Sequence, residues 1–184
     1  MQTSLVMLLA FSGMLAASAQ AAAPNLYAGE QARNIKALSP EDIDGYLGGK
    51  GMGLAKAAEL NGYPGPAHVL ALAKELQLST TQLEETELLF KEMEAKAMEA
   101  GQRLIYEEQR LDRLFATKAV TAALLVQSLS RIGELQAAVR QTHLETHLAQ
   151  HALLTSAQIA RYAELRGYAA GAPSANTTPM PKHH

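Results

Sequence analysis

The chain contains no cysteine and no tryptophan, and aromatic residues make up only 5% of its 184 positions. The absence of cysteine excludes disulfide bonds, thiolate zinc sites, iron–sulfur sites and a cysteine nucleophile. Charge is nearly balanced, at a formal net value of -2. This balance argues against a nucleic-acid-binding protein, which normally carries a concentrated basic surface. The length fits one domain that is held together by non-covalent contacts.

Charged residues are also missing from positions 1–23. The most apolar stretch there, Leu5 to Leu15, precedes the small-residue pattern Ala17-Ser18-Ala19. This arrangement is typical of a secretory signal peptide, although it lacks a basic residue at its start. The alternative is an uncleaved N-terminal membrane anchor, for which the apolar stretch is short of the roughly 20 residues that a span needs.

Proline is absent from residues 67–172, where Ala, Leu, Glu, Gln and Lys dominate. This is the composition of long helices, and no strand-like alternation interrupts it. We therefore predict an all-α protein. Its main helical domain covers residues 67–170, preceded by a Gly/Pro-rich segment with short helices at 24–66 and followed by a disordered tail at 171–184.

Apolar residues recur at heptad spacing from Ser79 onward, and a second apolar pattern begins near Thr121. The first set is Leu83, Phe90, Met93, Ala97, Ala100, Leu104, Leu111 and Leu114, and the second is Leu125, Leu129, Ile132, Leu135 and Val139. Because only a short connection separates the two patterns, we predict a long antiparallel helical hairpin with shorter flanking helices. Each arm would be about 45 to 55 Å long.

Three helix starts are marked by local sequence. Ser79 with Gln82, and Thr155 with Gln158, have the S/T-x-x-Q form of a capping box, in which the hydroxyl and the amide satisfy each other's backbone N–H groups. Ser39 precedes a proline and two acidic residues, which favour the first turn of a helix.

The glycine-rich stretch from Asp44 to Pro66 includes GGKGMG, which superficially resembles a phosphate-binding loop. It lacks the GxxxxGK[ST] spacing, and no strand precedes it. We expect a broken pair of helical turns there instead.

Three histidines, His143, His147 and His151, follow one another at spacings of four. Adjacent helical turns of this kind can present two imidazoles to one cation. Pairing across a hairpin centred near Lys118 brings His143 near Met93, so these four residues are a candidate site for zinc, copper, nickel or cobalt. The alternative is that the histidines bond to glutamates at a polar end of the seam or face a partner subunit.

The other polar residues do not form a recognisable catalytic or ligand-binding pattern. His68 stands alone before an apolar helical stretch, and we interpret it as a packing residue. No serine, histidine and aspartate arrangement or isolated carboxylate pair is recognisable, so the sequence predicts no enzyme and no required cofactor.

The apolar leader, the predicted hairpin and two Leu-Ser/Thr-x-x-Gln elements resemble the Spy/CpxP family of periplasmic proteins, which includes ZraP-like and CnrX-like metal-responsive members. The run from His143 to Tyr168 is especially similar to the heavy-metal-sensor branch. The resemblance covers roughly residues 38–168. The positions that match the family motif are Leu78, Ser79, Gln82, Leu154, Thr155 and Gln158.

The resemblance implies a periplasmic helical hairpin that forms a homodimeric curved cradle. It implies an ATP-independent chaperone or envelope stress-response protein that binds unfolded or misfolded periplasmic proteins. The alternative function within the family is a heavy-metal sensor with histidine, glutamate and methionine ligands, which regulates a membrane-bound sensor or an anti-sigma factor.

Overall fold

The computed structural model describes residues 27–168. The predicted export signal at 1–23 and the predicted disordered tail at 171–184 lie outside these residues. The chain divides into two compact units, Met1–Gln31 and Ala32–His184. A short 3-10 helix, η1 (Glu30–Ala32), spans the boundary, and everything below concerns the second unit.

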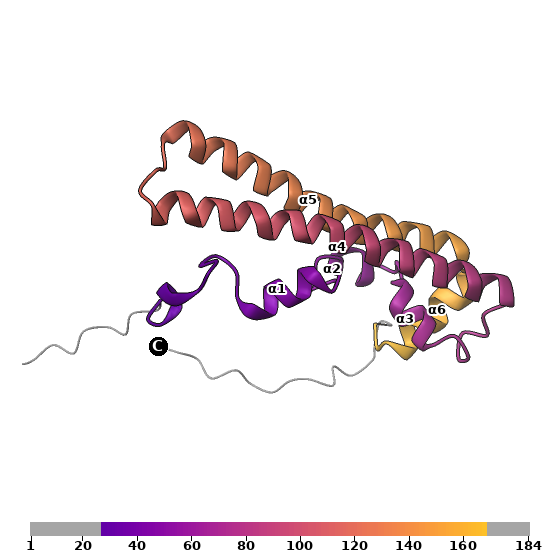
Figure 1. Ribbon diagram of the computed structural model, residues 1–184. Helices are drawn as coiled ribbons and strands as arrows, with labels where there is room; N and C mark the ends of the chain where they lie inside the picture. The colour runs from indigo at the N-terminus through magenta and orange to yellow at the C-terminus, as the bar shows by residue number, and fades with distance from the viewer. Residues whose placement is uncertain (1–26, 169–184) are drawn as a thin grey trace, which may run out of the picture. The chain divides into compact units, whose positions relative to one another are not determined.

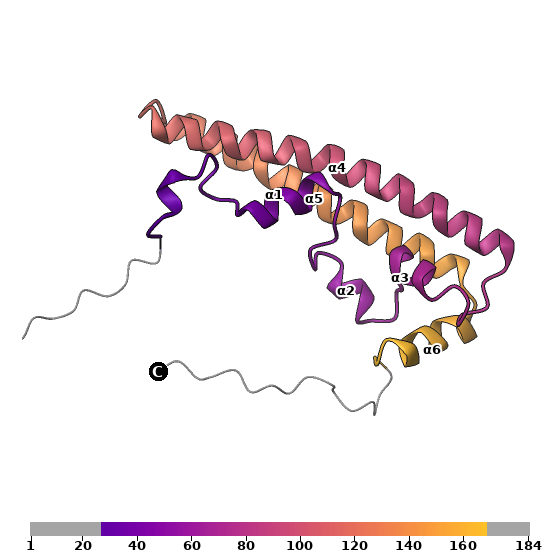
Figure 2. The ribbon, with the colours of Figure 1, turned by 60° about the horizontal axis from the view of Figure 1, so that its bottom comes forward.

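All regular structure in residues 27–168 is helical, which confirms the all-α class. Two helices far exceed the others in length and pack along each other (Figure 1). The smaller helices lie on one side of this pair, as the rotated view in Figure 2 shows. The helices are α1 (Pro40–Leu47), α2 (Lys56–Glu59), α3 (Pro66–Ala71), α4 (Thr80–Ala116), α5 (Ala122–Leu153) and α6 (Ser156–Leu165).

The seam between α4 and α5 is apolar along its middle. Its buried apolar side chains are Met93, Ala97 and Leu104 of α4 and Ile132, Leu135 and Val139 of α5, all of them predicted seam positions. One predicted seam residue is wrong, because Leu129 is 52% exposed while Ser128 is fully buried. Both residues lie about one helical turn before Ile132. The structure places Ser128, four positions before Ile132, in the seam, and leaves Leu129, three positions before it, outside the seam.

A close approach of backbones seats α1 against the middle of α4. A Cβ atom added at Gly101 would lie 2.6 Å from the carbonyl oxygen of Tyr46, so only glycine fits at that position of α4. Two turns further along the helix, Glu108 is buried as well, and burial raises the pKa of its carboxyl group. The contact holds α1, and hence the glycine-rich segment that follows it, against the long helix pair.

All three predicted helix starts are confirmed as capping boxes. They lie at Ser39, Ser79 and Thr155, and in each the third helical residue bonds back to the cap backbone. At the start of α5 the hydroxyl of Thr121 accepts a hydrogen bond from the Leu124 N–H (3.3 Å). Residues 117–121 therefore suffice to connect the two long helices.

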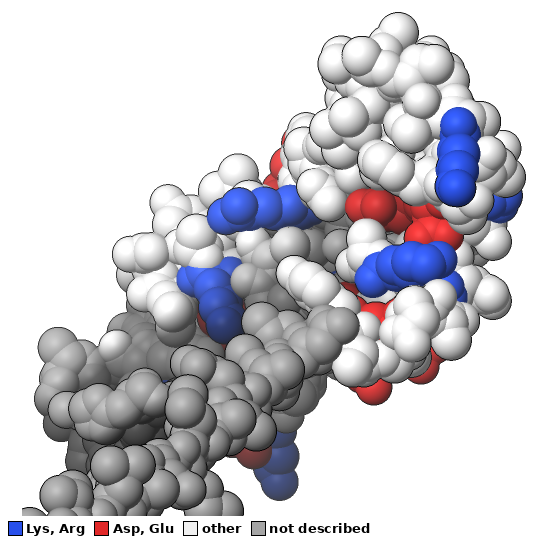
Figure 3. Space-filling model, turned by 90° about the vertical axis from the view of Figure 1, so that its left-hand side faces the viewer, with Lys and Arg blue, Asp and Glu red and all other residues white. Residues whose placement is uncertain are grey.

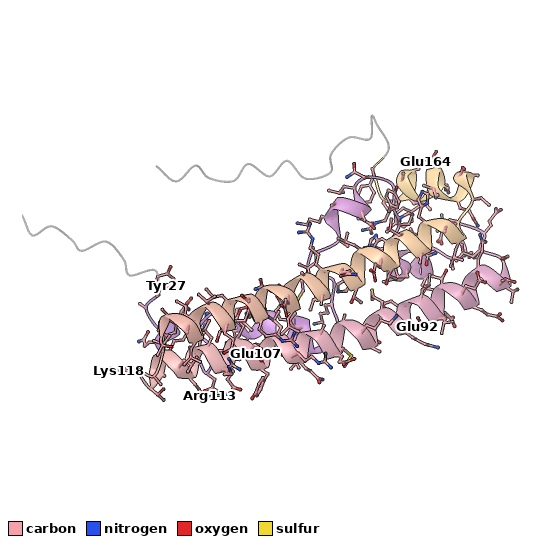
Figure 4. All side chains as sticks on the ribbon, turned by 90° about the horizontal axis from the view of Figure 1, so that it is seen from above. Tyr27, Glu92, Glu107, Arg113, Lys118 and Glu164 are labelled. Carbon is pink, nitrogen blue, oxygen red and sulfur yellow. The ribbon has the colours of Figure 1, made fainter. Side chains whose placement is uncertain are left out.

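The long pair has two unlike ends. We call residues 114–130, around the connection, the connected end, and we call the start of α4, the end of α5 and the packed helices α3 and α6 the open end. Figure 4 places Lys118 at the first and Glu164 at the second. A second core fills the open end, formed by Val69, Leu76, Leu154 and Tyr162.

Candidate functional site

A cavity of about 590 Å³ lies near the open end, between the glycine-rich segment and the long helices. Residues 48–68 supply one wall, and the rest comes from α4, α5 and the residues after α6. Two of the sequence-predicted histidines, His143 and His147, line this cavity together with Met93. The cavity is therefore where the candidate residues and the glycine-rich segment meet.

His143 contacts Met93, as the pairing of the two helices predicts. Its Nδ1 lies 3.2 Å from the Met93 sulfur, and its Nε2 is buried without a hydrogen-bond partner. Burial lowers the pKa of His143, and the neighbouring charge of His147 acts in the same direction. The Lys50 backbone lies close enough to the ring to raise this pKa, although the contact does not have the geometry of a hydrogen bond. The Nε2 atom of His143 is thus left without a hydrogen bond beside the cavity.

His147 has different partners from His143. Its Nδ1 lies 2.7 Å from the carbonyl oxygen of Tyr63, so this nitrogen is the donor, and 3.8 Å from a Glu59 carboxylate oxygen. Its Nε2 faces Gly65, where an added Cβ would lie 2.9 Å away. Gly65 thus has no room for a side chain while His147 keeps this position.

His151 lies outside the cavity lining, with its ring 4.6 Å from the ring of Tyr63. In residues 27–168 no group of three or more histidine, aspartate or glutamate side chains is arranged to hold a metal ion. Met93 and His143 are thus in contact, His147 bonds elsewhere and His151 stacks on a tyrosine. The metal site remains a prediction.

Glu59 is the residue at the centre of this region that sequence reasoning missed. One of its carboxylate oxygens accepts hydrogen bonds from the hydroxyls of Tyr162 (2.5 Å) and Tyr168 (3.3 Å), and Arg166 Nε lies 3.6 Å from it. His68 pairs with the same oxygen at 3.4 Å. The interpretation of His68 as a packing residue is wrong, because its side chain is about half exposed and pairs with this carboxylate.

Gln82 and Gln158, the glutamines of the two Leu-Ser/Thr-x-x-Gln elements, lie against each other at the open end. Gln82 donates to the Gln158 side chain (2.9 Å) and Gln158 donates back to Gln82 (3.0 Å). Each also donates to a backbone carbonyl near the other motif, Gln82 to Leu153 (2.8 Å) and Gln158 to Leu76 (3.2 Å). Since each amide oxygen also caps its own helix, the pair ties α4 to α6.

The connected end carries apolar side chains and little charge. Phe115, Val126 and Leu129 are 54%, 65% and 52% exposed, and Lys118 is the only charged residue between positions 114 and 130. In Figure 3, which views the unit from this side, most of the upper surface is neither acidic nor basic. Sequence reasoning missed this patch because it treated Leu129 as part of the seam.

No known family model, curated protein or solved structure matches the chain. The likeness to the Spy/CpxP family therefore stays a prediction. Among residues 27–168 no helix combines the length and the apolar character that a membrane span requires.

Proposed function

We propose that the chain is a periplasmic, ATP-independent chaperone of the Spy/CpxP type that binds unfolded or misfolded proteins without catalysing a reaction. The observation that carries this proposal is the connected end of the α4–α5 hairpin, where large apolar side chains lie exposed on a surface with a single charge. Exposed apolar patches mark surfaces that bind other proteins. Apolar segments of an unfolded client gain free energy by leaving water there.

Charged side chains along the rest of the helices complement this patch. Exposed ion pairs on the helix surfaces include Lys96–Glu92, Arg103–Glu99 and Arg131–Glu134. Exposed pairs of this kind add little stability and remain available to polar parts of a client. In the proposed homodimer, two hairpins form a cradle that presents both connected ends, and sedimentation analysis tests for that dimer.

Reduction-induced aggregation of insulin tests the chaperone proposal well, because the chain has no cysteine for the reductant to attack. We expect stoichiometric protein to suppress light scattering without ATP. We expect the triple variant Phe115→Ser/Val126→Ser/Leu129→Ser to lose most of this effect. The matched control is Leu88→Ser/Tyr106→Ser/Leu148→Ser, which alters three equally exposed residues of the same helices. No suppression by the wild type, or equal suppression by both variants, contradicts the proposal.

The contact of Met93 with His143 favours a second candidate function, a metal-dependent regulator of a membrane-bound sensor or anti-sigma factor. A thioether and an imidazole in contact suit a soft ion such as copper(I), and imidazoles suit zinc, nickel and cobalt. The fit is incomplete, because His147 Nδ1 is engaged by the Tyr63 carbonyl. In this function, His143 and Met93 hold the ion and His147 joins through Nε2.

Calorimetric titration of chelator-treated protein with each metal tests this second candidate. We expect His143→Ala to weaken binding strongly and His151→Ala to leave it unchanged, since His151 stacks on Tyr63 outside the cavity. Equal affinities for the wild type and a His143→Ala/His147→Ala variant would rule out this site.

A further inference from the structure

The size and lining of the cavity at the open end suit a small molecule. Its volume of about 590 Å³ lies within the range of about 300 to 1,000 Å³ that is common for small-molecule sites. Apolar side chains from both walls line it, namely Met52, Leu60, Pro66, Phe90 and Met93. An apolar molecular body would therefore be removed from water on entry.

Two buried polar atoms of the lining residues make no hydrogen bond, Arg166 Nε, which still faces a Glu59 carboxylate oxygen at 3.6 Å, and His143 Nε2. His143 is 3% exposed, and its Nε2 makes no hydrogen bond. A buried polar atom without a partner costs free energy, so native proteins contain few of them. His143 borders the cavity, but Nε2 itself has almost no accessible surface, so a polar group of a bound molecule supplies the missing partner once the ring or the adjoining wall shifts slightly.

The free charges of the lining favour an anion. Arg166 already pairs with Glu59, whose carboxylate is also bonded by two tyrosine hydroxyls. Lys50 and Lys56 also line the cavity, and within the described part of the chain neither has an ion-pair partner. The remaining acidic residue of the lining is Glu94. Two unpaired cations thus stand against one unpaired carboxylate.

The glycine-rich wall is closely fitted to the helix behind it. A Cβ added at Gly49 would lie 2.8 Å from the Glu94 carbonyl oxygen, and the backbone there has a φ of +59°, which favours glycine. Gly65 fits against His147 in the same way at the other edge of the wall. The wall that carries Lys50 is therefore held at a defined distance from His143.

We propose that this cavity binds a small amphipathic carboxylate, such as a medium-chain fatty acid. Its apolar body packs against Phe90 and Met93. Its carboxylate accepts hydrogen bonds from the ammonium groups of Lys50 and Lys56 and from the Nε2–H of His143, in the tautomer that leaves Nδ1 unprotonated beside the Met93 sulfur. This site is separate from the client-binding surface proposed at the connected end.

Calorimetric titration of the full chain with decanoate, below its micelle concentration and with a chelator present, tests the proposal. We expect saturable binding of one decanoate per chain. Decyltrimethylammonium, which has the same alkyl chain and the opposite charge, should bind at least about tenfold more weakly, because charged hydrogen bonds supply the discrimination.

Three variants locate the site. Lys50→Gln/Lys56→Gln should weaken decanoate binding at least about tenfold, whereas the control Lys74→Gln/Lys118→Gln, which removes two exposed lysines outside the cavity, should not. His143→Leu should weaken binding similarly while the protein keeps its helical circular dichroism and thermal transition. The connected-end triple variant should bind decanoate like the wild type.

Three results would overturn the proposal. The first is absence of decanoate binding to the wild type. The second is binding that the lysine and His143 variants leave unchanged and that the cationic surfactant matches, which would mean adsorption to exposed apolar surface. A loss of binding in the connected-end variant alone would likewise assign the ligand to that surface.

Discussion

The two ends of the long helix pair differ in whether their large apolar side chains are exposed or buried. At the connected end Phe115, Val126 and Leu129 stay in water, and Lys118 is the only charge. At the open end, Tyr162 and Val69 are buried, and polar side chains form hydrogen bonds among themselves. The difference shows that the same pair of helices has one end closed by buried and hydrogen-bonded side chains and another end whose apolar side chains remain exposed.

Removing one aromatic residue at each end gives the sharpest contrast. Tyr162→Ala should lower the free energy of unfolding by about 3 to 5 kcal/mol, because it empties a buried site and removes the shortest hydrogen bond to Glu59. Phe115→Ala should change it by less than about 0.5 kcal/mol, because the ring is exposed. Urea unfolding followed by circular dichroism measures both. Similar losses for the two variants would show that the ends do not differ as described.

The glutamine pair sharpens the comparison by a double-mutant cycle. Gln82→Ala and Gln158→Ala should each cost about 2 kcal/mol, the sum of a lost helix cap and a lost partly buried hydrogen bond. The double variant should cost less than the sum, because each single change already breaks the shared bonds. Gln127→Ala, an exposed change at the connected end, is the control. Strict additivity would mean that the two amides act independently.

The connected end depends on a simpler cap. Thr121→Ala should cost about 1 kcal/mol, because α5 loses the only side chain that accepts from its first N–H groups. Thr121→Ser keeps the hydroxyl and should restore most of the stability. Thermal unfolding measures both variants. An unchanged melting temperature in Thr121→Ala would show that water replaces this cap without loss.

The smallest expected effect is a pH dependence that belongs to the open end. Burial lowers the pKa of His143 below its usual 6.5, so the unfolded chain binds more protons than the folded one below that pH. The contribution of His143 is present above pH 6.5 and is lost as the pH falls toward the lower folded value. His143→Leu should therefore show a smaller drop in melting temperature between pH 7.5 and 5.5 than the wild type. The control Leu129→Ser should keep the wild-type drop, and an equal drop in His143→Leu would contradict the assignment.

Features with a local cause could be predicted from the sequence. The three capping boxes follow from residues three apart, and the contact of Met93 with His143 follows from counting back from the connection. The Glu59 cluster could not be predicted in this way. Its tyrosine partners, Tyr162 of α6 and Tyr168 just after that helix, lie more than 100 residues further along the chain, and no periodic pattern links a short glycine-rich segment to them.

The seam residues show a second limit of periodicity. A heptad pattern cannot tell whether the position three or four residues before Ile132 faces the partner helix, so Leu129 was assigned to the seam in place of Ser128. Buried polar residues such as Glu108 escape the same pattern because it counts apolar positions alone. Because of this ambiguity, the sequence did not predict the exposed apolar surface at the connected end, on which the proposed function depends.

The mutual bonding of Gln82 and Gln158 has a consequence for synthesis of the chain. The first turn of α4 obtains its full set of partners only when the residues through Gln158 have emerged, since that side chain and the Leu153 carbonyl complete it. A nascent chain that stops short of α6 thus keeps the local capping box of α4 but lacks the bonds that join this helix start to α6. The start of α4 and the start of α6 can therefore bond to each other only after nearly all of the helical unit has emerged from the ribosome.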